Sequence, residues 1–192
     1  MVANGNSSLP EHYERHFGPI SQGWSDENAT HGVQIVSFDD QPQPGVRTYA
    51  TLGLSDHLLN LPKGRRIRQE LLVCADDAAS NDKVAAFLLS FAEHVLTRGA
   101  ALLRGEVVGP STSVIPGSTA NAIYVTNPSP FADSLVQFEG PEPPIVFAYL
   151  VPITSQEAAL IHERGWSWFE VQLEEQNPDI WNLARSEEIV AR

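Results

Sequence analysis

One uninterrupted apolar run constrains the fold of this chain more than any other feature. Residues 145–151, Ile-Val-Phe-Ala-Tyr-Leu-Val, contain no charged side chain. A strand that is apolar at every position is typical of a sheet interior, where both faces are covered by other layers. The shorter run 71–74, Leu-Leu-Val-Cys, has the same character. Both runs predict buried strands, and 145–151 is the best candidate for a central strand.

The remaining pattern alternates short strand signals with amphipathic segments. Residues 82–98 have apolar side chains at steps of three and four and predict the longest helix, which Gly99 would end. Capping-box spacing at Ser8 and Glu11, and again at Thr154 and Glu157, marks the starts of two further helices. The other expected elements are helices over 10–17, 154–165 and 166–176, a short turn or helix at 180–183, strands over 33–38, 46–52, 69–75, 102–108 and 121–126, and a loop over 20–32.

This order of elements predicts an α+β fold in one domain, with a mixed β-sheet flanked by helices. A chain of 192 residues buries roughly 70% of its extended surface on folding, which is enough for a core without disulfides or metal. No linker or repeat divides the chain. We expect a flexible N-terminus over 1–9 and the folded domain over 10–192.

Charge and composition narrow the classes of partner. Twelve basic and 24 acidic residues give a formal charge of −12, which repels nucleic acid and favours encounter with a basic protein. No segment reaches the ~20 apolar residues of a membrane span, and the N-terminus lacks a secretory signal. The single cysteine, Cys74, fits a reducing compartment, so we expect a cytoplasmic protein. One short basic loop, containing Lys63, Arg65, Arg66 and Arg68, interrupts the acidic composition.

Candidate catalytic groups are sparse. Ser55, Asp56 and His57 are adjacent, but a nucleophile elbow requires glycine at the position that His57 occupies. We therefore interpret these residues as a turn rather than a catalytic site. His12 and His16 share one helix face, as metal ligands can, but no third ligand has suitable spacing and an exposed helix face is the preferred interpretation. We therefore expect no enzyme activity, metal, cofactor or small-molecule ligand. A metal-dependent or serine-type hydrolase is the alternative.

The C-terminal part is acidic and rich in tryptophan. Trp166, Phe169 and Leu173 share helical spacing and are expected in the core. Trp168 lies off that stripe: it either packs against the terminal segment or, if exposed, anchors a partner protein or a second copy of the chain. The last possibility defines a further alternative, a homo-oligomeric structural protein.

Four segments in order resemble the suppressor of fused domain. They are an aromatic strand that runs into a Gly-Leu-Ser-Asp turn (48–56), a Glu-Leu strand (68–72), the long helix (82–98), and an apolar strand with a Pro-Ile-Thr turn and a Glu-bearing helix (147–157). Residues 12–18 are similar to the N-terminal helix of that family. The resemblance covers about 10–176, and Glu70, Pro152, Thr154 and Glu157 are its structural positions. If Glu70 is buried, it needs a partner such as Arg47 or a loop amide.

The resemblance implies a non-enzymatic protein-binding domain. Animal members restrain zinc-finger transcription factors by clamping a peptide as an added strand between two domains, and bacterial single-domain members include immunity proteins that neutralise polymorphic toxins. This chain lacks the second domain and has a basic loop where an acidic one is expected, so a bacterial-type member that binds a basic toxin domain is the better analogue. The protein-binding residues we expect are Gly53, Leu54, Ser55, Asp56, His57, Trp168, Glu174 and Glu175.

Overall fold

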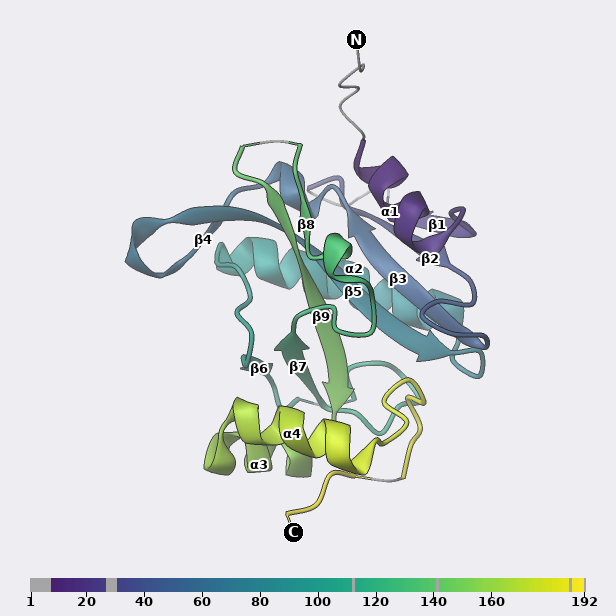
Figure 1. Cartoon of the computed structure of the whole chain (residues 1–192), viewed down its shortest axis with the longest axis vertical. Coiled ribbons are helices and arrows are strands. Elements are labelled where there is room, and N and C mark those ends of the chain that lie inside the picture. Colours follow the sequence, from purple (N-terminus) through teal and green to yellow (C-terminus); the bar gives the residue numbers. More distant parts are fainter. Residues whose placement is uncertain (1–7, 27–30, 112, 141, 187, 192) are drawn as a thin grey trace.

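A computed structural model describes residues 8–26, 31–111, 113–140, 142–186 and 188–191. Its centre is a mixed sheet in the order β1-β2-β3-β5-β9-β7-β6, with β4 paired to β5 and β8 paired to β9 (Figure 1). Among the strand pairs of the described residues, only β5 and β9 are parallel. The strands are β1 (Gln22–Ser25), β2 (Gln34–Phe38), β3 (Val46–Leu52), β4 (Leu59–Asn60), β5 (Arg66–Asp76), β6 (Val107–Val108), β7 (Ala122–Thr126), β8 (Gln137–Phe138) and β9 (Ile145–Ile153).

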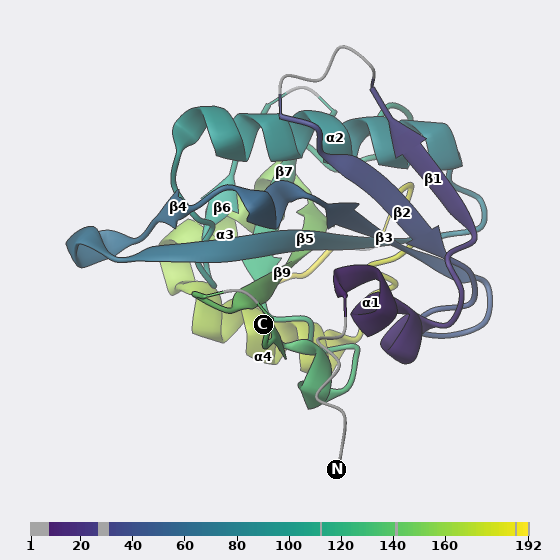
Figure 2. The same ribbon diagram turned by 90° about the horizontal axis from the view of Figure 1, so that it is seen from above.

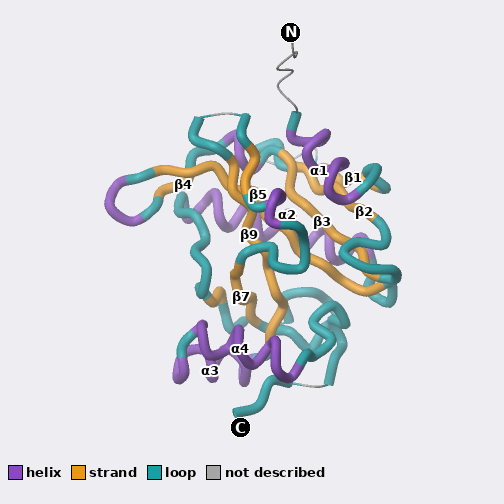
Figure 3. The backbone as a smooth tube through the Cα atoms, in the orientation of Figure 1, coloured by secondary structure: helices purple, strands orange, loops and turns teal. Residues whose placement is uncertain are grey.

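Helices cover both faces of this sheet. The α-helices are α1 (Leu9–Phe17), α2 (Asn81–Arg98), α3 (Ser155–Arg164) and α4 (Trp166–Gln176), and three short 3-10 turns are η1 (Leu54–Asp56), η2 (Pro62–Gly64) and η3 (Asp133–Leu135). Seen from above, α2 lies on one side of the sheet, and α1, α3 and α4 lie on the other (Figure 2). The tube in Figure 3 shows that long loops join the outer strands. The expected α+β class, with one mixed sheet between helices, is confirmed.

The two apolar runs of the sequence form the central parallel pair. Leu71 of β5 lies opposite Ala148 of β9, and Leu72 opposite Tyr149. Successive strand residues face opposite sides, so Leu71 contributes to the core under α2, while Leu72 contributes to the core under α1, α3 and α4. Because both faces are covered, neither strand has a polar face. This explains why the sequence shows no alternation there.

The predicted helix starts are also confirmed. Ser8 and Glu11 form a reciprocal capping box at α1, and Thr154 and Glu157 form another at α3. The segment expected to be flexible, 1–9, lies outside the described residues except for Ser8 and the first helical residue, Leu9. Gly99 ends α2 with a φ of 65°, a conformation that glycine adopts without steric cost.

Two local predictions are wrong. The expected loop 20–32 contains strand β1, which pairs with β2 and places Trp24 opposite Ile35. The expected strand 102–108 is mostly loop, and only Val107 and Val108 form a strand. The buried Gln69 side chain explains the second case: its amide donates to the Leu102 carbonyl and accepts from the Leu102 amide, so a side chain occupies backbone groups that a neighbouring strand would use.

A buried ion pair fastens the C-terminal segment to α3. Glu157 is fully buried and receives two hydrogen bonds from the guanidinium of Arg185, of 2.9 and 2.7 Å. The backbone amides of Thr154 and Ile189 complete its coordination. Two charges removed from water are tolerated only when their partners are this well placed. No helix of the described residues is long and apolar enough to cross a membrane.

This arrangement makes Arg185 a stability residue. Arg185→Ala leaves the Glu157 carboxylate buried without its cation, and we expect the free energy of unfolding in urea to fall by about 3–5 kcal/mol. The matched control is Arg164→Ala, which breaks the exposed pair with Glu163 and is expected to cost about 0–1 kcal/mol. Equal losses in the two variants would show that the buried pair adds nothing specific.

Candidate functional site

The Gly53–His57 segment is organised around the buried carboxylate of Glu70. One Glu70 oxygen accepts the amides of Gly53 and Ser55 at 3.1 and 3.0 Å, and the other accepts the hydroxyl of Thr51. Gly53 has a φ of 102°, which a residue with a side chain rarely adopts, so the turn depends on glycine. Of the two partners expected for Glu70, the loop amides are confirmed and Arg47 is not, since Arg47 pairs with Asp39.

Glu70 lies in a strongly perturbed electrostatic environment. Complete burial raises the pKa of its carboxyl to about 7, and the hydrogen bonds from Thr51, Ser55 and Gly53 keep the pKa from rising further. Arg68 adds to the same cluster by donating to the Ser55 carbonyl at 2.7 Å. The hydrogen bonds of this cluster hold the end of β3, η1 and the start of β5 together, so its role is structural.

The geometry limits what this turn can offer a partner. Leu54 and Ser55 are buried, Gly53 and His57 are half-buried, and Asp56 is exposed. Within the described residues no hydrogen bond joins Ser55 to His57; the imidazole of His57 instead lies 3.3 Å from the carbonyl oxygen of His31. The three adjacent residues therefore do not form a nucleophile–base pair.

The two histidines of α1 have separate environments. His12 is buried between Phe138 and Phe147, which corrects the expectation of an exposed face. Burial, together with the neighbouring His16, lowers the pKa of His12 to about 4. The other ring, His16, contacts the Ser134 hydroxyl at 3.0 Å. In the part of the chain that the structure describes, no three His, Cys, Asp or Glu side chains are placed to hold a metal ion.

A groove beside α4 has the features of a protein-recognition site. Its volume is about 420 Å³, and it lies between α4, strands β7 and β9, and the segment around η3. Its lining is mixed, with polar and apolar side chains in similar measure, and the charged lining residues are Asp133, Glu170, Glu174 and Arg104. The apolar lining residues are Pro128, Val136, Tyr149, Val151, Leu173 and Ile180.

Glu170 is the fixed acidic group of this groove. It pairs with the Arg104 guanidinium and accepts the hydroxyls of Tyr124 and Thr126, each at 2.8 Å. Burial opposes ionisation of Glu170, but hydrogen bonds from Arg104, Thr126 and Tyr124 outweigh it, so the pKa of the carboxyl is lowered. Glu174 lies one helical turn further along α4 and is exposed. Asp133 and Glu174 are therefore the available negative charges on the groove border.

The tryptophans of α4 are placed differently from the sequence prediction. Phe169 is fully buried as expected, but Trp166 is 40% exposed, and the guanidinium of Arg104 lies 4.9 Å from its ring centroid. Its ring also lies so close to Gly105 that a Cβ there would be 2.5 Å from the ring. Trp168, expected off the stripe, is half-buried against the core of its own chain. The exposed tryptophan of α4 is thus Trp166 rather than Trp168.

Of the acidic pair expected to bind a partner, only Glu174 lines the groove. Glu175 is exposed and accepts a hydrogen bond from Gln172. Sequence reasoning missed Asp133 and Glu170, because they lie 37 positions apart and only the packing of η3 near α4 brings them to one cavity. The homo-oligomer alternative stays a prediction.

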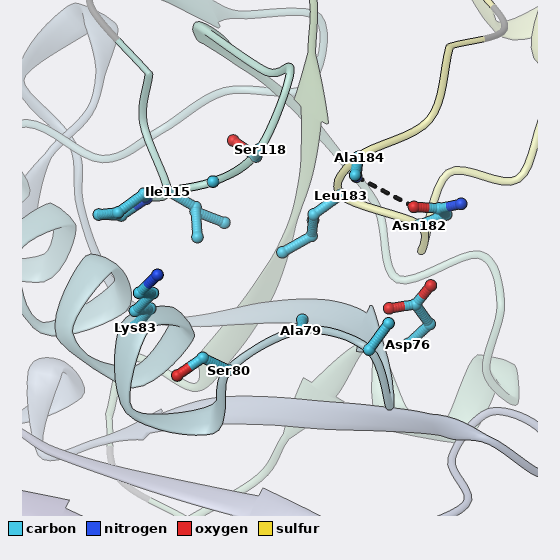
Figure 4. Close-up of a pocket in the computed structure, with 12 residues that line it drawn as sticks. Asp76, Ala79, Ser80, Lys83, Ile115, Ser118, Asn182, Leu183 and Ala184 are labelled. Atoms are coloured by element: carbon cyan, nitrogen blue, oxygen red, sulfur yellow. Dashed lines mark hydrogen bonds between the residues drawn. The ribbon is translucent and has the colours of Figure 1, made fainter.

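A second, smaller cavity of about 200 Å³ lies between the start of α2, the loop 115–118 and the C-terminal segment (Figure 4). Lys83 and Asp76 stand on different sides of it, and Leu183 projects between the segments. Its border carries one cation and one anion, so it lacks the acidic excess of the groove beside α4.

Comparison with known proteins places this fold in a family. The family model for the suppressor of fused protein matches residues 29–186, which is most of the chain. The chain belongs to the suppressor of fused family. Among solved structures, a suppressor of fused homologue from Neisseria gonorrhoeae has a TM-score of 0.75 at 14% identity and covers 94% of both chains. A structure of the Sufu–Fu complex has a TM-score of 0.73 at 13% identity and covers 96% of this chain and 92% of that chain.

A curated relative comes from bacteria. The chain is 26% identical over 168 residues to the immunity protein YqcF of Bacillus subtilis, and the alignment covers 86% of each protein. The structure of Drosophila Suppressor of Fused has a TM-score of 0.62, and this chain covers 42% of it. The family resemblance seen in the sequence is confirmed.

The raised pKa of Glu70 predicts a pH-dependent stability. The folded state holds the Glu70 proton up to about pH 7, and the unfolded carboxyl loses it near 4.5, so the contribution of Glu70 is full below pH 4.5 and falls as pH rises to 7. Glu70→Gln resembles the protonated form. We expect its stability in urea unfolding to exceed that of wild type by less than about 1 kcal/mol at pH 5 and by about 3 kcal/mol at pH 8.

The difference between the unfolding free energies of wild type and Glu70→Gln at each pH cancels the contributions of the other titrating groups. His12 acts in the opposite sense, because its lowered pKa reduces stability as pH falls from 6.5 towards 4, but it is common to both proteins. An offset between wild type and Glu70→Gln that is the same at pH 5 and pH 8 would contradict the prediction.

Proposed function

We propose that this chain is a cytoplasmic immunity protein that neutralises a toxin by binding it, without catalysis. Membership of the suppressor of fused family and the similarity to immunity protein YqcF support this class. The observation that carries the proposal is the groove beside α4, which combines apolar side chains such as Leu173 with the exposed carboxylates of Asp133 and Glu174.

The groove fits a basic toxin domain. The formal charge of −12 steers a basic surface towards the chain, and this effect acts mainly on the rate of association. Once in contact, an apolar side chain of the toxin would pack on Val136 and Leu173, and a neighbouring Lys or Arg of the toxin would meet the acids of the groove. Apolar contact of this kind slows dissociation. Neutralisation then requires only that the bound toxin cannot reach its target.

The test is a search for the toxin itself. Genomic fragments of the source organism that stop the growth of a heterologous host are co-expressed with this chain. We expect a fragment that encodes a basic domain to be neutralised by the wild type, and Asp133→Lys/Glu174→Lys to weaken its binding by about tenfold to a hundredfold, measured by calorimetry at low and high salt.

The matched control is Asp77→Lys/Glu163→Lys, which changes the net charge equally at exposed positions away from the groove. We expect it to keep neutralisation and to change affinity less than about threefold. Failure of every toxic fragment to be neutralised would contradict the immunity function. Equal behaviour of the two double variants would leave neutralisation intact but contradict the assignment of the groove.

A further inference from the structure

The hairpin formed by β4 and the start of β5 projects from the body of the molecule. Figure 1 shows it extending sideways beyond α2, and the view from above in Figure 2 shows the same projection. Its tip contains η2 and three exposed basic residues, Lys63, Arg65 and Arg66. Arg68, the fourth member of the basic loop expected from sequence, lies further along β5 and is held by the Ser55 carbonyl.

The base of this hairpin is firmly attached. Leu59 is buried and lies opposite Ile67, and the Leu61 amide donates to the Arg65 carbonyl at 2.8 Å. Asn60 links the hairpin to the end of α2: its backbone amide and its side chain both donate to the Gly99 carbonyl, at 3.0 and 2.8 Å. The tip is therefore presented by an ordered support.

The basic residues of this chain are otherwise mostly neutralised by carboxylates. In the described part of the chain, five arginines take part in ion pairs with Asp or Glu, namely Arg47, Arg98, Arg104, Arg164 and Arg185. Lys63, Arg65 and Arg66 have neither a hydrogen bond nor an ion pair from their side chains within the same residues. Three unpaired cations thus gather within four positions of an acidic protein.

We propose that the tip of the β4–β5 hairpin is a second recognition surface, and that it binds an acidic segment of a partner protein. Arginine guanidinium groups pair with carboxylates in a two-pronged geometry, and two of the three tip cations are arginines. The whole chain has a formal charge of −12, and the part outside the three tip cations is more negative still. A long polyanion such as nucleic acid would therefore be repelled by the surface beyond the tip. A short acidic segment meets the tip alone. This surface is separate from the groove, and the proposal does not rest on the immunity function.

The test titrates isotope-labelled protein with hexaglutamate and follows the backbone amides by NMR. We expect shifts confined to residues 59–68, and an affinity that falls as salt is raised. Lys63→Ser/Arg65→Ser/Arg66→Ser is expected to lose about tenfold or more in affinity. Because these side chains are exposed and have no partners in the described part of the chain, the variant should keep the wild-type melting temperature, which is checked by circular dichroism.

The matched control removes the same charge from other exposed positions, as Arg15→Ser/Lys83→Ser/Arg164→Ser. We expect its affinity for hexaglutamate to stay within about twofold of wild type. Equal weakening in the two triple variants, shifts spread over the whole surface, or no binding by wild type would each overturn the proposal. Tighter binding of a thymidine oligonucleotide than of hexaglutamate would also overturn it, since the tip would then be a phosphate-binding surface.

Discussion

The parallel pairing of β5 with β9 is the constraint on which the rest of the structure depends. Both strands are buried on both faces, so the chain must supply a helical layer on each side, and it does so with α2 on one and α1, α3 and α4 on the other. The turn, groove and hairpin described above occur along this pair. Glu70 lies in β5 and holds the Gly53 turn, Tyr149 and Val151 of β9 form the floor of the groove, and the basic hairpin is the extension of β5 beyond its partner.

Buried carboxylates hold the loops of this fold in place. Glu70 fixes the turn after β3 and Glu157 fixes the C-terminal segment, and in both cases backbone amides are among the donors. They differ in their counter-charge, since Glu157 has Arg185 while Glu70 has no cation among its hydrogen-bond donors. Burial without a cation explains why the pKa of Glu70 rises. Conversely, Glu170 at the half-open groove keeps a lowered pKa because Arg104 supports its charge.

The groove beside α4 and the hairpin tip carry charges of opposite sign. The groove presents carboxylates next to apolar side chains, whereas the hairpin tip presents cations on a projecting support. A protein that met the groove with basic residues and the tip with acidic residues would be held in one orientation. In the reversed orientation like charges would lie opposite each other, which is costly. The fold itself is shared with solved structures that are only 13–14% identical, so most side chains of this chain differ from theirs while the architecture is the same.

The sequence by itself determined the buried strands, the helix that begins near Asp82, both capping boxes and the family, because each depends on residues that are close together in the chain. It failed where a distant group decided the outcome. Gln69 converts an expected strand into a loop through hydrogen bonds to Leu102, and Arg104 and Gly105 place Trp166 at the surface. Only the tertiary structure brought Asp133 to the same groove as Glu170 and Glu174. Only it distinguished the arginines that have carboxylate partners from the three tip cations, which have none among the described residues. Local pattern sets the elements, but burial and pairing of charges depend on which elements meet.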